Sequence, residues 1–213
     1  YKLRPGHTLL VERGKPLPAQ HEYWDVPFTP VAVGSERDLC DEVFARLREA
    51  VEIRLVAEVP LGAFLSGGVD SSAVVAAMAQ LQNDPVNTCA IGFDVPQFNE
   101  TDFARQVAQR YNTNHFERIV ASDDFDLLDT LGALYDEPYA DSSAIPTYRV
   151  CQLARERVTV ALSGDGGDEN FAGYRRYRWH MNEERLRGAL PLGLRKPLFG
   201  ALGRLYPKLD WAP

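Results

Sequence analysis

The stretch Ser66-Gly67-Gly68-Val69-Asp70-Ser71-Ser72 decides the fold, because it joins a short apolar run to a helical pattern. Residues 61–65, Leu-Gly-Ala-Phe-Leu, are typical of a buried strand, and residues 71–81 are an Ala- and Val-rich helix candidate. The two glycines allow a tight turn that brings backbone N–H groups close to a ligand, at the positive end of the helix. Three serine hydroxyls add further donors. The stretch therefore predicts a site for an anion such as a phosphate.

The rest of the chain repeats the same order of strand and helix. Further strands are predicted over residues 88–93, 116–120 and 158–162, and further helices over residues 101–110, 124–134 and 145–157. This alternation predicts an α/β fold, a parallel doubly wound sheet with flanking helices. The last strand leads into a second glycine-rich loop, Ser163-Gly164-Asp165-Gly166-Gly167-Asp168-Glu169. Ligands bind at the carboxyl ends of such strands, so we expect both loops to share one crevice.

The acids in the two loops indicate a metal ion. Neither the GxxxxGK[ST] loop nor the GxGxxG fingerprint is present, and the first loop has no lysine. An aspartate beside phosphates would repel them unless a cation lay between, and Mg²⁺ accepts one or two carboxylates together with phosphate oxygens. We expect Asp70 and Asp168 to hold one or two Mg²⁺ ions against a triphosphate. Either residue alone could be a helix cap, but two Ser-Gly loops with acids at matching strand ends favour a binding site.

Together the two loops resemble a known family. SGGVDSS resembles the SGGxDS signature of the PP-loop ATP pyrophosphatases, which are adenine nucleotide alpha hydrolase-like proteins. Its pairing with SGDGGDE is similar to the synthetase domain of the glutamine-hydrolysing asparagine synthetase B family and its relative β-lactam synthetase. Other matching segments are Cys89-Ala90-Ile91-Gly92-Phe93, Phe98-Asn99-Glu100, Asp136-Glu137-Pro138 and Gly173-Tyr174.

The resemblance implies an ATP-dependent ligase and assigns its residues. The aspartate side-chain carboxylate would be adenylated with release of pyrophosphate, and ammonia from glutamine would then displace AMP to give asparagine. The cofactors would be ATP and Mg²⁺, with Asp70 and Asp168 as metal ligands. Asp165 would be the catalytic acid that orients the substrate ammonium or the incoming ammonia. The residues implied around ATP are Leu65, Ser66, Gly67, Gly68, Asp70, Ser71, Ser72, Ile91, Ser163 and Gly164.

Three parts are expected along the chain. Residues 1–25 resemble the C-terminal remnant of a glutaminase (N-terminal nucleophile) domain and predict a strand or hairpin. Residues 26–35 contain two prolines and a glycine and predict a linker. Residues 36–213 would be an asparagine synthetase-like ATP-binding domain truncated at its C-terminus, beginning with a long helix capped by Ser35. No cysteine is terminal, so the ammonia source is expected to lie outside this sequence, and the fragment alone is expected to be incomplete.

Composition excludes several other classes. The 213 residues carry 23 basic and 30 acidic side chains, with the basic ones concentrated after residue 173, so the acidic body argues against a nucleic-acid partner. No apolar run is long enough for a membrane span, and three scattered cysteines indicate no disulfide framework or zinc site. Cys89 and Cys151 are expected to be core residues in a cytoplasmic protein. The partners expected are small molecules, and a homodimer is compatible with the resemblance.

Besides aspartate amidation, two other enzymatic functions and one non-enzymatic function stay open. One is an asparagine synthetase-like amidotransferase that acts on another carboxylate, for instance in exopolysaccharide biosynthesis. The other is a PP-loop enzyme that modifies tRNA, which the acidic body and the absence of a CxxC pair count against. The non-enzymatic alternative is that the chain is a catalytically silent fragment or a binding module. Neither Lys196 nor Lys208 has a sequence context that assigns it a catalytic role.

Overall fold

The computed structural model describes residues 2–27, 29, 34–95, 97, 99–120, 127–135, 139 and 141–205. Several predictions fall outside these residues: Phe98, the Asp136-Glu137-Pro138 segment, most of the second half of the linker, and the start of the helix expected from residue 124. The chain divides into two compact units, Tyr1–Ala45 and Arg46–Pro213, and each is described by itself.

The N-terminal unit contains a short hairpin, as the sequence predicts. Strand β1, His7–Thr8, pairs antiparallel with β2, His21–Glu22. Helix α1, Glu36–Glu52, begins after Ser35 in this unit and continues into the second one. The Asp38 backbone N–H donates to the Ser35 hydroxyl at 3.2 Å, and the Ser35 N–H donates back to the Asp38 carboxylate at 3.0 Å. This reciprocal cap confirms the predicted helix start.

The second unit is built on a four-stranded parallel sheet in the order β5-β4-β3-β6. The expected strands are all present, with ends shifted by a few residues at most. The strands are β3 (Leu61–Phe64), β4 (Asn87–Phe93), β5 (Asn114–Val120) and β6 (Val160–Leu162). The helices between them are α2 (Val69–Leu81), α3 (Thr101–Arg110), α4 (Leu128–Leu134) and α5 (Ala144–Arg155).

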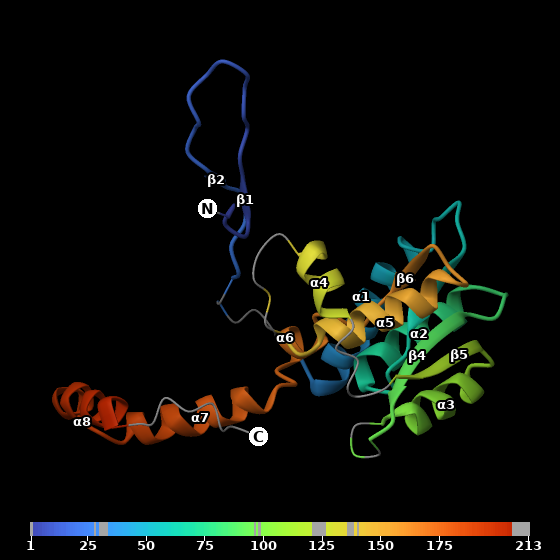
Figure 1. The fold of residues 1–213 in the computed structure, drawn as a ribbon. Coiled ribbons are helices and arrows are strands. Elements are labelled where there is room, and N and C mark those ends of the chain that lie inside the picture. The colour runs from blue at the N-terminus through green and yellow to red at the C-terminus, as the bar shows by residue number, and fades with distance from the viewer. Residues whose placement is uncertain are drawn as a thin grey trace. The chain divides into compact units, whose positions relative to one another are not determined.

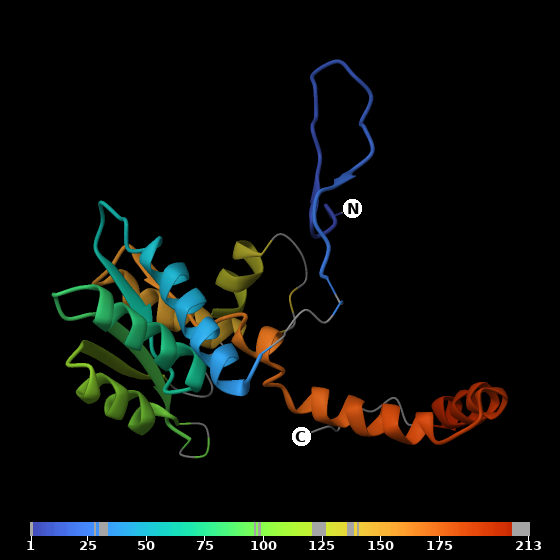
Figure 2. The ribbon, with the colours of Figure 1, turned by 180° about the vertical axis from the view of Figure 1, so that it is seen from behind.

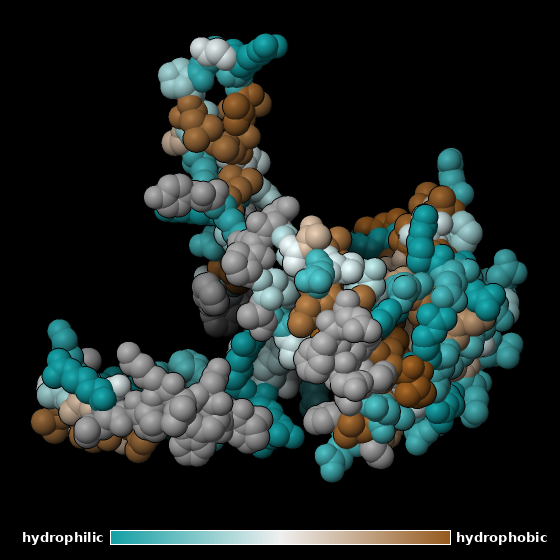
Figure 3. Space-filling view, in the orientation of Figure 1, coloured by the Kyte–Doolittle hydropathy of each residue, from teal (hydrophilic) through white to brown (hydrophobic). Residues whose placement is uncertain are grey.

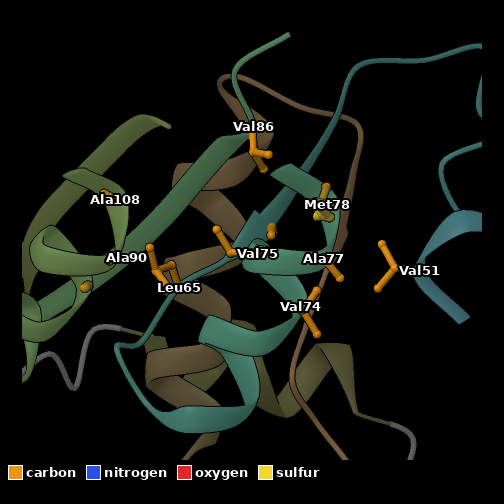
Figure 4. Close-up of a cluster of buried hydrophobic side chains, with 11 residues drawn as sticks. Val51, Leu65, Val74, Val75, Ala77, Met78, Val86, Ala90 and Ala108 are labelled. Atoms are coloured by element: carbon orange, nitrogen blue, oxygen red, sulfur yellow. The ribbon is translucent and has the colours of Figure 1, made fainter. Parts of the chain in front are cut away.

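Helices cover both faces of this sheet. Figures 1 and 2 show α5 on one face and α2 with α3 on the other. Side chains from β3 and β4 alternate between the two sides, as the strand period requires. On the α2 side, Leu65 and Ala90 pack with Val75 and Met78 (Figure 4). On the α5 side, the buried Cys89 packs with Leu153 and other side chains of a second cluster. The prediction of a doubly wound parallel sheet is therefore confirmed.

A polar network ties α3 to the neighbouring edge of the sheet. The Arg105 guanidinium donates from Nε and Nη2 to the two carboxylate oxygens of Glu117, each at 2.9 Å. Next to it, His115 Nδ1 lies 2.9 Å from the Thr88 hydroxyl, while the buried Nε2 has no hydrogen-bond partner. Burial lowers the pKa of His115, an effect that Glu117 opposes and Arg105 reinforces. His115 is thus a neutral side chain in this environment near pH 7.

After the sheet the chain continues as helices α6 (Gly167–Phe171), α7 (Arg175–Gly188) and α8 (Leu192–Leu205). Neither α7 nor the described part of α8 has a buried residue, and Figure 3 shows apolar side chains on the surface of this segment. Cys151 is exposed on α5, so its expected place in the core is wrong, whereas Cys89 is buried as expected. None of the helices in the described ranges combines the length and apolar content that crossing a bilayer requires.

Candidate functional site

The order of the strands reverses beside β3, and this reversal places the two glycine-rich loops together. Going along the chain from β3, the next two strands add on one side, to give β3-β4-β5. Strand β6 then pairs on the other side of β3, with Ala63 opposite Leu162. The loop from Ser66 and the loop from Ser163 therefore leave adjacent parallel strands at the same edge. Such a switch point is where open α/β sheets form ligand crevices.

A cavity of about 790 Å³ lies at this edge. Its volume falls within the range of roughly 300–1,000 Å³ that is usual for small-molecule sites. Both loops line it, so the expectation of one shared crevice agrees with the geometry. The predicted site residues that line the cavity are Leu65, Ser66, Gly68, Asp70, Ser71, Ile91, Ser163, Gly164, Asp165 and Asp168. Gly67 and Ser72 are not among its lining residues.

The amino end of α2 faces the cavity without a side-chain cap. Gly68 occupies the N-cap position and, being a glycine, supplies no side chain to accept a hydrogen bond from the first turn. The hydroxyls of Ser66 and Ser71 lie 3.0 Å apart and hydrogen-bond to each other. Ser72 instead donates to the Gly68 carbonyl at 2.6 Å, along its own helix. An α-helix start leaves several N–H groups without intrahelical partners, so this end can receive an anion.

Gly67 lets the first loop turn tightly against α3. Its φ of +89° lies in the left-handed region that favours glycine, and a Cβ there would come within 2.7 Å of the Ala104 backbone nitrogen. The loop consequently packs directly on the start of α3. The sequence predicts this residue as part of the phosphate cradle, and the geometry gives it a role in the turn that forms the cradle.

The two loops touch each other through glycines. A Cβ at Gly164 would come within 2.6 Å of the Ser71 backbone nitrogen, which leaves no room for a side chain. A Cβ at Gly167 would lie 2.6 Å from each carboxylate oxygen of Asp70. The second loop therefore packs against the start of α2, and the Asp70 carboxylate lies on the Gly167 backbone.

Four carboxylates line the cavity, and their hydrogen bonds divide them into two pairs. Asp165 accepts from the Ser163 hydroxyl at 3.0 Å, and Glu169 accepts from the Tyr174 hydroxyl at 2.7 Å. In the described part of the chain, Asp70 and Asp168 have no side-chain hydrogen bond or ion pair. The described residues that line the cavity also include no lysine or arginine. Two acids are therefore held by hydroxyl groups, and two are available to a cation.

The hydrogen bond between Tyr174 and Glu169 changes the acidity of both groups. It raises the pKa of Tyr174 to about 12, and it lowers the pKa of the Glu169 carboxyl. Tyr174 is thus the donor and Glu169 the ionised acceptor near neutral pH. The Arg176 guanidinium lies over the Tyr174 ring, 4.4 Å from its centre.

The donor set fits Mg²⁺ only in combination with other ligands. Among the described residues, no group of three or more His, Cys, Asp or Glu side chains could hold a metal ion alone. Mg²⁺ in nucleotide sites commonly uses one or two carboxylates, completed by phosphate oxygens and water. Asp70 and Asp168, both without a side-chain partner, satisfy that smaller requirement. The fit therefore depends on a phosphate-bearing ligand in the same cavity.

Several lining residues are not predicted from the sequence. Pro146, Thr147 and Val150 come from α5, which reaches the site because it is the crossover between β5 and β6. Only the strand order shows that these residues reach the cavity, and the strand order cannot be read from patterns in a single sequence. Glu169 and Tyr174 stand inside motifs that the sequence does show, but nothing in the spacing pairs them. Cys89 also lines the cavity, and burial raises the pKa of its thiol, so it is a poor nucleophile.

The second unit is thus an α/β domain with a parallel sheet, two glycine-rich loops at its switch point and two acids that have no side-chain partner among the described residues. Residues 42–211 match the model of the asparagine synthase family, and the chain belongs to that family. It is 38% identical over 189 residues to a putative glutamine-hydrolysing asparagine synthetase 2 of Methanocaldococcus jannaschii, covering 87% of this chain and 36% of that protein. It is 34% identical to glutamine-hydrolysing asparagine synthetase 1 of Bacillus subtilis, covering 83% of this chain and 28% of that protein.

The chain thus spans about a third of the length of these curated relatives. A more distant relative is the amidase chry2 of Gibberella zeae, 28% identical over 98% of this chain and 36% of that protein. Among solved structures, an NH3-dependent NAD synthetase from Campylobacter jejuni matches with a TM-score of 0.42 and 13% identity, covering 63% of this chain and 60% of that one.

Proposed function

We propose that this chain forms the ATP-binding part of a ligase that adenylates the side-chain carboxylate of aspartate and amidates it with ammonia derived from glutamine. The observation that carries the proposal is the shared cavity, where the uncapped start of α2 and two carboxylates without a side-chain partner among the described residues follow adjacent strands. Membership of the asparagine synthase family supports the reaction class. Aspartate as the acceptor and glutamine as the source of ammonia are more specific than this reaction class, and we propose them in addition.

The first loop would bind the phosphates of ATP. The N–H groups in the first turn of α2 supply donors with a favourable dipole, and the hydroxyls of Ser66 and Ser71 lie beside them. Leu65 and Ile91, together with Ser163 and Gly164, would surround the adenosine. Gly164 suits this position because its lack of a side chain lets the second loop lie directly against α2.

Asp70 and Asp168 would hold Mg²⁺ between themselves and the phosphates. When bound, the ion supplies neutralisation of phosphate charge and makes pyrophosphate a better leaving group. The Gly167 backbone restricts where the Asp70 carboxylate can lie, because it occupies the space on one side of that group. This restriction keeps one ligand directed into the cavity before the ion arrives.

Asp165 would act on the nitrogen side of the reaction. An oxygen of the side-chain carboxylate of the substrate aspartate attacks the α-phosphorus of ATP, and the bond between that phosphorus and pyrophosphate breaks. Ammonia then attacks the acyl carbon, AMP leaves with its oxygen, and the nitrogen loses a proton. The Asp165 carboxylate, held by the Ser163 hydroxyl at 3.0 Å, would orient the cationic or proton-losing nitrogen.

Nucleotide binding by this chain tests the metal site. ATP affinity should rise on addition of Mg²⁺, and the Asp70→Asn and Asp168→Asn variants should lose that increase while keeping metal-free binding. Asp84→Asn is a matched control, because Asp84 is an exposed aspartate that does not line the cavity. Equal Mg²⁺ dependence in all four proteins would remove the metal assignment.

ATP–pyrophosphate exchange in the full-length protein tests the acceptor. Exchange should require both aspartate and Mg²⁺. The similarity to a protein named as an amidase supports a second candidate, an amidotransferase of this family that acts on another carboxylate. Exchange that another carboxylate supports and aspartate does not would favour that candidate and overturn the assignment to aspartate.

A further inference from the structure

Residues 168–174 form a closed turn at the wall of the cavity. The Gly173 N–H donates to the Asp168 carbonyl at 3.0 Å, and Gly173 lies so close to the Asp168 carboxylate that a Cβ there would overlap its Oδ1. Between them, Ala172 has a φ of +56°, which is uncommon for a residue with a side chain. The backbone of this turn therefore fixes the place of the Asp168 carboxylate.

The side chain of Tyr174 closes the turn. Its hydroxyl donates to Glu169 Oε1 at 2.7 Å, which links the last residue of the turn to the residue after Asp168. Its ring lies 4.4 Å from the Arg176 guanidinium and 6.0 Å from the Tyr177 ring, and these contacts restrict its movement. The backbone N–H groups of Ala172 and Gly173 both donate to the Asp168 carbonyl, with Ala172 as the C-cap of α6. The hydrogen bond of Tyr174 adds a side-chain link across the same turn.

From this arrangement we infer that Tyr174 is a positioning residue for the metal side of the cavity. Its hydrogen bond to Glu169 holds the turn closed, and the closed turn holds the Asp168 carboxylate in the orientation that Mg²⁺ and the phosphates need. Glu169 acts here as a hydrogen-bond acceptor and does not ligate the ion. The inference rests on the proposed function, because it assumes that Asp168 binds the metal ion with ATP.

The expected effect of Tyr174→Phe is a specific loss of Mg²⁺-dependent nucleotide binding. Removal of a group that orients a metal ligand typically costs roughly 10- to 100-fold in metal affinity, and we expect the lower end of that range. ATP affinity without Mg²⁺ should change little, because the first loop is untouched. Tyr177→Phe is the matched control, since Tyr177 lies beside Tyr174 but does not line the cavity. Circular dichroism and thermal unfolding would confirm that both variants fold.

Two substitutions at Glu169 distinguish positioning from direct ligation. Glu169→Gln keeps an oxygen that accepts from Tyr174, so it should retain most of the Mg²⁺ effect. Glu169→Ala should reduce the Mg²⁺-dependent increase in ATP affinity as much as Tyr174→Phe does. The double variant Tyr174→Phe/Glu169→Ala should reduce that increase no further than either single variant. If Glu169→Gln loses Mg²⁺-dependent ATP binding as Glu169→Ala does, while Tyr174→Phe keeps it, Glu169 acts by its charge and the inference is wrong.

The same titrations separate this inference from the proposed function. If Asp70→Asn and Asp168→Asn leave the Mg²⁺ dependence intact, the proposed metal site fails and the role of Tyr174 fails with it. If those variants lose the Mg²⁺ dependence but Tyr174→Phe matches the Tyr177→Phe control, only the positioning role is overturned.

Discussion

The carboxylate of Asp70 rests on the backbone of Gly167, although the two residues belong to loops far apart in the sequence. The contact exists because β3 and β6 are neighbours in the sheet and send both loops to the same edge. Any side chain at residue 167 would occupy the place of that carboxylate. The pair thus connects the backbone of one loop to the chemistry of the other.

Gly167→Ala should impair the site without unfolding the protein. The added Cβ would lie 2.6 Å from both Asp70 carboxylate oxygens. The Asp70 side chain can rotate away from it, because the carboxylate is the end of a flexible side chain. Mg²⁺-dependent ATP binding should fall while thermal stability changes little. Gly132→Ala is a suitable control, since nothing lies within 4 Å of a Cβ at that helical glycine. Normal Mg²⁺ dependence in Gly167→Ala would contradict the role given to the contact.

Gly164→Ala should behave differently, with a loss of stability. Here the added Cβ would meet the backbone at Ser71, 2.6 Å from its nitrogen, so one of the two loops must move. Overpacking of this kind typically costs about 1–3 kcal/mol in the free energy of unfolding. Chemical denaturation of the wild type, Gly164→Ala and Gly132→Ala would measure it. A Gly164→Ala protein as stable as the wild type would show that the loops separate easily.

Stability should fall in acid through His115. Its pKa is lowered in the folded protein by burial, so below about pH 6.5 the unfolded chain takes up a proton that the folded one resists. This contribution is complete above that pH and is lost as the pH falls toward the folded pKa. Arg105 and Glu117 face the ring from α3 and β5, and Thr88 and Thr113 are uncharged neighbours in the same network.

The measurement is the free energy of unfolding from pH 8 to pH 5 in the wild type and in His115→Gln. The variant should show a shallower decline, because its side chain does not titrate. His180→Gln serves as the control at an exposed histidine on α7. Parallel curves for the wild type and His115→Gln would rule out this contribution.

Ser35→Ala should weaken the start of α1. The Ser35 hydroxyl accepts from the Asp38 N–H at 3.2 Å, and loss of such a cap typically costs about 1 kcal/mol. Ser35→Thr should retain most of the stability, because threonine supplies the same acceptor. Denaturant unfolding of the three proteins checks the order. A Ser35→Ala protein that unfolds at the same denaturant concentration as the wild type would mean that the first turn of α1 is not part of the cooperative structure.

Much of the fold is predictable from the sequence because its signals are local. The apolar runs and the glycine-rich ends of Leu61–Phe64 and Val160–Leu162 predict strands that feed loops, and the alternation with helices predicts a parallel sheet. The order β5-β4-β3-β6 depends on packing between distant segments, so it is not predicted. Cys151 illustrates the same limit, since an apolar helical pattern does not say which side of α5 faces water.

The candidate site divides in the same way. Asp70 and Asp168 can be predicted because each stands in a recognisable loop at a strand end. Glu169 and Tyr174 pair across a turn in which Ala172 has a positive φ. An alanine in the sequence does not predict that conformation. Ser72 shows the opposite case. Its place in the motif suggests a ligand contact, while its hydroxyl is engaged by the Gly68 carbonyl.

The pairing of β3 with β6 also bears on the order in which the protein folds. Strands β3, β4 and β5 can join through short, local crossovers, whereas β6 must close a much longer loop before it adds beside β3. A chain that has formed only the first three strands has one glycine-rich loop but no cavity. The proposed nucleotide site would then be completed at the last step of sheet assembly, and bound ATP should slow amide hydrogen exchange in Val160–Leu162 more than in Asn87–Phe93.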